Sequence, residues 1–124
     1  QTTEKVAALG FPVVHLASLN DINAGSMQGL THEEVAKNFP EIYSARARNK
    51  LRYRYPNGES YEDVFRRVEP VILEMMGETS PVIIISHLPV LRILYGYLTD
   101  TPPEECPSIE IPLNCIIMLS PMGY

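Results

Sequence analysis

Cysteine, long apolar runs and repeated segments are scarce or absent in this sequence. The chain of 124 residues holds only two cysteines, Cys106 and Cys115, and neither they nor the acids and histidines show metal-ligand spacing. We therefore expect a reducing, cytoplasmic environment and a protein that carries no metal and no cofactor. No apolar run approaches the roughly 20 residues that cross a bilayer, and no signal peptide precedes the first helical pattern, so we expect a soluble protein without a membrane partner.

The acidic balance of the chain is broken by one basic segment. The formal net charge is −5, which argues against nucleic acid as a partner. Five of the ten basic residues nevertheless lie in the nine-residue stretch 46–54, "RARNKLRYR". Such a run can be no more than a solvated surface. The alternative is an anion-binding surface, because the planar guanidinium group binds two phosphate oxygens at once.

Strand-like and helix-like patterns alternate along the chain. Apolar, β-branched segments typical of buried strands lie at 12–19, 81–86 and 115–122. Helical patterns precede or separate them, at 2–9, from Thr31, from Pro40, from Ser60 to Gly77, and at 88–98. Strands that are apolar on both faces and separated by helices predict one α/β domain with a mainly parallel sheet.

Two titratable residues follow predicted strands. His87 stands where the strand 81–86 gives way to a helix, and Asp21 follows the first strand. In parallel sheets ligands gather at the carboxyl ends of strands, where helix N-termini direct unpaired amides toward anions. A lone histidine at such a point can be a simple polar cap, but Arg92 and the basic segment also indicate an anion site. We therefore predict that His87 faces a bound phosphate.

Four stretches of the sequence resemble one known family. They are "LNDINAG", "YRYPNGESYEDVFRRVEPVILE", "ISHLPVLR" and "IPLNCIIMLSP". Together they are similar to the histidine phosphatase superfamily, and most of all to the fructose-2,6-bisphosphatase domains of bifunctional 6-phosphofructo-2-kinase/fructose-2,6-bisphosphatase enzymes. The resemblance implies a three-layer α/β/α fold of the phosphoglycerate mutase type, with residues 1–124 as the C-terminal part of a single domain.

The resemblance also implies a reaction and the residues that carry it out. The family hydrolyses phosphomonoesters in two steps, through a phosphohistidine formed on the histidine of an Arg-His-Gly motif. His87 matches the second active-site histidine, which holds the transferring phosphoryl group. Asp21 stands where the family has a glutamate that protonates the departing sugar oxygen. The expected substrate is fructose 2,6-bisphosphate, which loses its 2-phosphate to give fructose 6-phosphate.

The same resemblance assigns the basic segment to the second phosphate of this substrate. Arg46, Lys50 and Arg54 match the basic residues that bind this phosphate in the family. Tyr61, in "GESY", would add a hydroxyl group. Two further arginines are expected to face outward, Arg48 and Arg52.

The sequence departs from the family in three places. Asp21 is one methylene shorter than glutamate, and Leu88 replaces a residue that is usually glutamine, so the sugar preference stays open. The Arg-His-Gly motif is absent, and His15 and His32 are no substitutes because neither follows an arginine. We therefore expect the chain to be N-terminally truncated and inactive by itself. Loss of the central strand would also leave sheet edges and an apolar face exposed.

Two explanations of the missing strand are open. A longer bifunctional polypeptide with its kinase domain upstream could supply the strand, which we favour, or another chain could fill the gap, as in a homo-oligomer. Two other functions are also open. The parent protein could be a phosphatase or mutase that acts on phosphoglycerate or another sugar phosphate, or the chain could be a non-catalytic anion-binding module.

Overall fold

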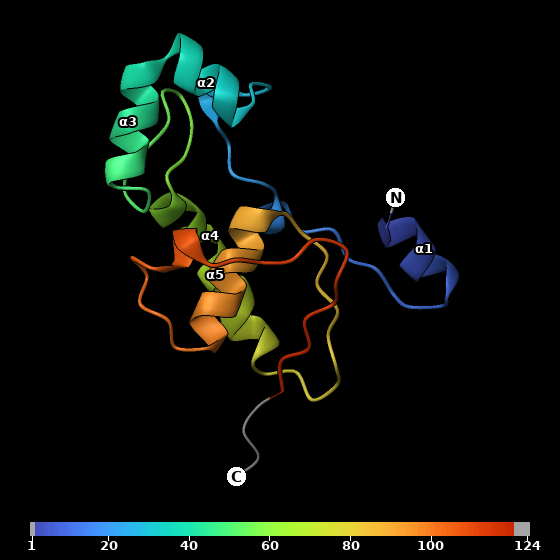
Figure 1. The fold of residues 1–124 in the computed structure, drawn as a ribbon. Helices are drawn as coiled ribbons and strands as arrows, with labels where there is room; N and C mark the ends of the chain where they lie inside the picture. The colour runs from blue at the N-terminus through green and yellow to red at the C-terminus, as the bar shows by residue number, and fades with distance from the viewer. Residues whose placement is uncertain (1, 121–124) are drawn as a thin grey trace.

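Helices are the only regular secondary structure in residues 2–120, the part of the chain that a computed structural model describes. They are α1 (Thr2–Ala8), η1 (Ala17–Leu19), η2 (Gly25–Met27), α2 (His32–Asn38), α3 (Pro40–Arg48), α4 (Tyr61–Met75), α5 (Leu88–Leu98) and η3 (Cys106–Ser108), where η denotes a 3-10 helix. Figure 1 shows α4 and α5 at the centre, α2 and α3 above them, and α1 at one side. The helices predicted from Pro40 and over 88–98 are confirmed.

Local hydrogen bonds explain where two of the helices begin. At α2 the Thr31 hydroxyl accepts from the Glu34 amide at 3.1 Å, and the Glu34 carboxylate accepts from the Thr31 amide at 3.1 Å. Ser60 and Asp63 form the same capping box at the start of α4. A capping box pairs two of the amides that the first helical turn otherwise leaves unbonded. Both helix starts predicted from the sequence are confirmed.

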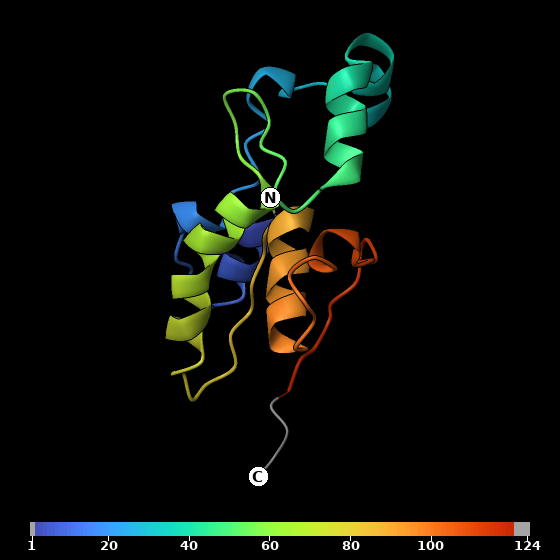
Figure 2. The same cartoon turned by 90° about the vertical axis from the view of Figure 1, so that its left-hand side faces the viewer.

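The larger hydrophobic core lies between α4 and α5, which run side by side with their N-terminal ends at the same end of the molecule (Figure 2). Val64, Val68 and Ile72 repeat every four residues along α4 and are fully buried. Val90 and Ile93 of α5 are buried against them. Each such side chain contributes about 1.5–3 kcal/mol by its burial, so the helix pair is a firm support for residues near its N-terminal ends.

A smaller hydrophobic cluster lies near α2 and α3. It consists of Met27, Val35 and Tyr55, and Tyr53 packs against it. Ile22 is packed against both this cluster and the larger core. The loop that contains Ile22 therefore joins the two parts of the molecule.

The segments predicted as strands show no strand pairing within residues 2–120. Residues 81–86 and 115–120 form no regular structure, and Ala17–Leu19 form a 3-10 helix, so the strand prediction for these three residues is wrong. A strand needs a neighbour that pairs its backbone groups. No such neighbour is present in the described range, and the side chain of Ile116 is 97% exposed. The predicted parallel sheet is therefore not seen there, and positions 121 and 122 of the last predicted strand lie outside the described residues.

Lowering the pH is expected to loosen the first turn of α4. Hydrogen bonds from the Arg54 side chain and from the Ser60 backbone hold the pKa of Asp63 well below its usual range. Such a carboxylate stabilises the folded state fully above its unfolded pKa of about 4, and the contribution is lost as the pH falls through the lower folded value. Protection factors for amide exchange in this turn should fall accordingly between about pH 5 and pH 2.

The Asp63→Asn variant separates this effect from general acid unfolding. It should lower the free energy of opening of this turn at neutral pH by about 1 kcal/mol, which is the contribution of a helix cap. It should also remove most of the pH dependence of amide exchange in the turn. Glu69→Gln, which neutralises an exposed carboxylate on the same helix, should leave both quantities unchanged. If the Asp63→Asn profile still fell with acid as before, another carboxylate would be responsible.

Candidate active site

A cavity of about 280 Å³ is lined by residues of both hydrophobic clusters. Its polar walls come from the loop after η1, from α2 and α3 with the turn that follows, from the start of α4 and from α5. The polar and charged lining residues are Asp21, Gln28, His32, Arg46, Lys50, Tyr55, Tyr61 and Arg92. Three of them, Arg46, Lys50 and Arg92, are basic residues, in a chain whose net charge is −5. The cavity therefore suits an anionic ligand.

The buried Tyr61 side chain holds the three cations together. Arg92 Nη1 donates to the Tyr61 hydroxyl oxygen at 2.9 Å. The guanidinium carbon of Arg46 lies 5.9 Å from the centre of the Tyr61 ring and 4.9 Å from that of Tyr55, and Lys50 Nζ lies 6.0 Å from the Tyr61 ring. Aromatic faces attract cations, so the two rings keep like charges close together. Because Tyr61 accepts from Arg92, its own hydroxyl proton can be donated to a ligand.

Lys50 and Arg92 also connect the cavity to η3. Lys50 Nζ donates to the Pro107 carbonyl oxygen at 3.1 Å, and Arg92 Nε donates to the Ile109 carbonyl oxygen at 2.8 Å. Burial, together with the charges of Arg92 and Arg46, lowers the pKa of Lys50. A phosphate bound among these groups would offset that repulsion and favour the charged ammonium.

Asp21 and His87 lie near each other where α5 begins. His87 is the N-cap residue of α5, and its Nδ1 atom is 3.9 Å from Asp21 Oδ2. Both side chains are more than half exposed. The next residue of the helix, Leu88, lines the cavity, as Asp21 does. The acid and the imidazole are therefore both accessible to a ligand that enters from solvent.

The loop that carries Asp21 is bonded to the turn that precedes α4. The Asn23 amide donates to Glu59 Oε1 at 2.9 Å, and the Glu59 amide donates to the Asn23 carbonyl oxygen at 2.7 Å. Gly25, with a φ of +56°, and Gly58 stand at the closest approach of the two backbones. A Cβ atom at Gly25 would overlap the Pro56 carbonyl, and one at Gly58 would overlap the Asn23 carbonyl. Only glycine fits at these two positions.

The structure brings most of the predicted site residues to one place. Asp21, Arg46, Lys50 and Tyr61 line the same cavity. His87 adjoins it through its contact with Asp21. The roles assigned to these residues stay predictions.

Arg54 is placed elsewhere. Its Nε and Nη2 atoms each donate to the Asp63 carboxylate at 2.7 Å, and it is not among the residues that line the cavity in the described part of the chain. A phosphate would have to compete with Asp63 for this guanidinium group. The assignment of Arg54 to substrate binding stays a prediction that this geometry does not favour.

Two residues considered in the sequence touch the cavity in ways that the sequence did not indicate. His32, considered only as a substitute for the missing nucleophile, is exposed and lines the cavity. Leu88, whose identity left the sugar preference open, lines it too. Both side chains can therefore contact a bound sugar.

Sequence reasoning did not place Arg92 and Tyr55 in the site. Arg92 had been noted only as a supporting charge. It lies four residues after Leu88, one helical turn further, so both occupy the same face of α5. If Leu88 is known to line the cavity, this spacing of four residues indicates that Arg92 lines it as well. Tyr55 lies in an irregular segment, where no periodic pattern indicates the direction of a side chain.

The described residues contain neither a metal cluster nor a membrane-spanning helix. In residues 2–120, no three histidine, cysteine, aspartate or glutamate side chains are grouped closely enough to hold a metal ion. No helix in the same range has the length and apolar character required to cross a membrane.

The chain belongs to a superfamily of phosphate-handling enzymes. The family model of the histidine phosphatase superfamily (branch 1) matches residues 1–123, so this chain is a member of the histidine phosphatase superfamily. The match confirms the resemblance seen in the sequence.

Within the superfamily, the chain is similar to bifunctional enzymes of sugar phosphate metabolism. It is 55% identical over 109 residues to a 6-phosphofructo-2-kinase/fructose-2,6-bisphosphatase of Arabidopsis thaliana, a match that covers 88% of this chain and 15% of that protein. It is 40% identical over 124 residues to the human 6-phosphofructo-2-kinase/fructose-2,6-bisphosphatase 1, covering 100% of this chain and 26% of that protein. The chain thus spans about a quarter or less of the length of these relatives.

Solved structures with a similar fold include a further phosphatase. A mycobacterial glucosyl-3-phosphoglycerate phosphatase in complex with VO3 has a TM-score of 0.73 and 25% identity, and the match covers 88% of this chain and 57% of that chain. Bacillus stearothermophilus YhfR has a TM-score of 0.72 and 25% identity, covering 88% and 56%. These likenesses confirm the fold family that the sequence resemblance implied.

Proposed function

We propose that this chain is the C-terminal part of a fructose-2,6-bisphosphatase domain within a longer, cytoplasmic, bifunctional enzyme with an upstream kinase domain. The observation that carries the proposal is the gathering of Arg46, Lys50 and Arg92 around Tyr61. A bisphosphorylated sugar requires two anion-binding positions. The three cations offer one position inside the cavity, and His87, beside Asp21 at the start of α5, offers the other. The 40–55% identity to bifunctional relatives supports the same assignment.

In this proposal the 2-phosphate leaves in two steps. A histidine of an Arg-His-Gly segment, which is not among the 124 residues, attacks phosphorus, and the N–P bond forms as the bond to the sugar oxygen breaks. That oxygen takes a proton from the Asp21 carboxyl group. Water then attacks phosphorus, returns a proton to Asp21 and releases phosphate and the free histidine. His87 holds the phosphoryl group throughout.

The substrate is tested by phosphate release from the complete polypeptide. Fructose 2,6-bisphosphate should give a higher kcat/KM than 3-phosphoglycerate or glucosyl-3-phosphoglycerate, because only the bisphosphate occupies both anion positions. A preference for either monophosphate would identify the parent protein as another phosphatase or mutase of the superfamily. Phosphate binding without turnover of any substrate would support an anion-binding module instead.

The 124-residue chain by itself is expected to release no phosphate from fructose 2,6-bisphosphate. None of its three histidines follows an arginine, and no other residue of the sequence matches the nucleophile of the family. The complete polypeptide, assayed in parallel, provides the positive control. Turnover by the isolated chain that His87→Ala abolishes would contradict this account and identify His87 as the nucleophile.

A further inference from the structure

We propose that Arg67 is a positioning residue that fixes the backbone of the general acid Asp21, an inference that rests on the proposed function. Arg67 lies in the second turn of α4 and is not among the residues that line the cavity in the described part of the chain. Nothing in the sequence separates it from its neighbour Arg66. Its position in the fold gives it a different role.

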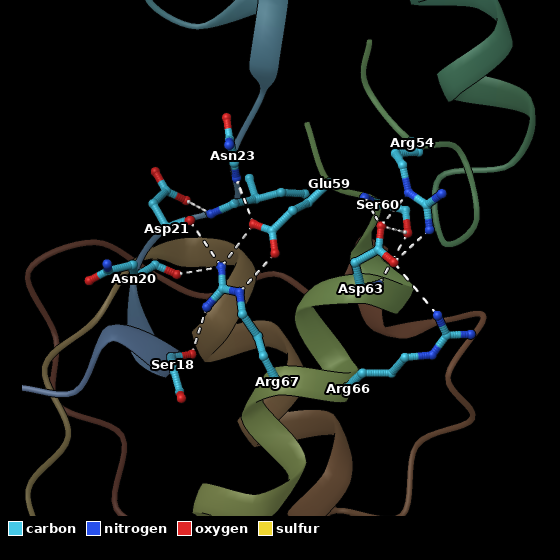
Figure 3. Close-up of polar contacts among 11 residues, drawn as sticks. Ser18, Asn20, Asp21, Asn23, Arg54, Glu59, Ser60, Asp63, Arg66 and Arg67 are labelled. Carbon is cyan, nitrogen blue, oxygen red and sulfur yellow. Dashed lines mark hydrogen bonds and ion pairs between the residues drawn. The ribbon is translucent and has the colours of Figure 1, made fainter. Parts of the chain in front are cut away.

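The guanidinium group of Arg67 is bonded to three carbonyl groups of one short loop. Figure 3 shows these hydrogen bonds as dashed lines from the Arg67 guanidinium group to the backbone of the loop. Nη1 donates to the Ser18 carbonyl oxygen at 2.6 Å, and Nη2 donates to those of Asn20 and Asp21 at 2.8 and 3.0 Å. Because the guanidinium fork is planar and rigid, these bonds fix the path of the loop as well as its distance from α4.

Glu59 holds Arg67 from the opposite side. Arg67 Nε donates to Glu59 Oε2 at 2.9 Å and Nη2 donates to Oε1 at 3.1 Å, and Oε1 also accepts from the Asn23 amide. Burial raises the pKa of Glu59, but the hydrogen bonds from Arg67 and Asn23 outweigh it and keep the pKa below its ordinary value. Both partners of the pair are only 24% exposed, so this charged contact is less screened than an ion pair on the open surface.

Within residues 18–21, the Leu19 carbonyl group is the one that accepts no hydrogen bond from Arg67. It is bonded instead to the segment that carries His87. The Ser86 hydroxyl donates to the Leu19 carbonyl oxygen at 2.6 Å. The loop is therefore held on one side by α4 and on the other by the residue that immediately precedes His87. Its position relative to the imidazole is fixed by both contacts.

This support matters because the acid is an aspartate. With one methylene fewer than glutamate, its carboxylate has little freedom to reach a substrate by rotation alone. The side chain itself is restrained by the Ile22 amide, which donates to Asp21 Oδ1 at 2.8 Å and belongs to the same loop. A displacement of the loop therefore moves the carboxylate with it. A misplacement of about 1 Å can cost on the order of 10²-fold in rate.

The test compares two substrates that differ in their need for an acid. A sugar alcohol leaves slowly unless it is protonated, whereas p-nitrophenyl phosphate releases a stable phenolate that needs no proton. In the complete polypeptide, Arg67→Gln should lower kcat/KM for fructose 2,6-bisphosphate about 10- to 100-fold, and for p-nitrophenyl phosphate less than about 3-fold. Arg66→Gln removes an exposed charge from the adjacent position and should leave both values near those of the unsubstituted enzyme.

Equal losses on both substrates would show that Arg67 only maintains the fold, and no loss on either would show that the loop does not depend on it. Both results would overturn the proposal. If Arg67→Gln fails to fold, Arg67→Lys allows the same comparison, because lysine keeps the charge but lacks the planar fork.

Amide exchange separates a failure of this inference from a failure of the proposed function. If the unsubstituted enzyme does not hydrolyse fructose 2,6-bisphosphate, the proposed function is wrong, but exchange at Ile22 and Asn23 still tests the contacts of Arg67. Arg67→Gln should increase exchange at these amides by about tenfold or more relative to Arg66→Gln. Equal exchange in the two variants would refute the positioning role whatever the substrate.

Discussion

His87→Ala in the complete polypeptide is expected to lower kcat for fructose 2,6-bisphosphate by about 10²- to 10³-fold, the loss typical of removing one preorganised donor to a reacting group. The imidazole lies where α5 begins, 3.9 Å from the carboxylate of Asp21, which lines the cavity. It can stabilise the charge on the transferring phosphoryl group, which is spread over the equatorial oxygens. KM should change much less than kcat, because the cations inside the cavity are unchanged. Steady-state kinetics measures both values.

The matched control for this variant is His15→Ala. His15 is also exposed, but it lines a separate shallow groove with Thr3 and Val13. Its replacement should leave kcat and KM near their original values. His87→Ala should also leave α5 intact, since the imidazole makes no capping hydrogen bond in the described structure. A kcat that is unaffected by His87→Ala would remove this residue from the catalytic machinery.

Lys50→Gln is expected to raise KM for fructose 2,6-bisphosphate by about 10- to 100-fold, because a hydrogen bond to a charged group contributes about 1.5–3 kcal/mol. The change in kcat should be small. The contact between Lys50 and a remote phosphate is the same in the ground state and in the transition state, so its loss weakens both equally.

Arg48→Gln is the control for the loss of charge. Arg48 is the last residue of α3, two positions before Lys50, and its side chain is exposed. Replacing it removes the same charge from the same segment but should leave KM nearly unchanged. If the two variants raised KM equally, general attraction of the substrate by the basic segment would explain the effect, and the specific contact of Lys50 would not.

Local interactions made the helices predictable from the sequence. Ser60 and Asp63 form their capping box within three residues, so the residue types alone indicate the start of α4. The segments 81–86 and 115–120 are different, since apolar β-branched residues become a strand only when a neighbouring strand pairs with them. Their composition indicates what they can form, but the described part of the chain does not supply that neighbour.

The candidate site was predictable to the extent that a motif identified it. Asp21 and His87 were located by their positions in segments that resemble the family, and the structure places them 3.9 Å apart. The pairing of Arg54 with Asp63 could not be foreseen, because it requires the turn before α4 to fold back on the helix. Arg67 could not be identified at all, since the carbonyl groups to which it donates lie 46 to 49 residues earlier and meet it only through the path of the loop.

Because Gly25 and Gly58 are in contact, the loop that carries Asp21, called here the acid loop, and the turn before α4 form one rigid unit. Neither backbone can shift toward the other, and no side chain can be added at their junction. Substitutions in one turn are therefore tolerated only if the other turn still matches it in shape. To graft the acid loop of a relative onto this chain, for example to restore a glutamate in place of Asp21, one would have to transplant the partner turn at 55–59 in the same step.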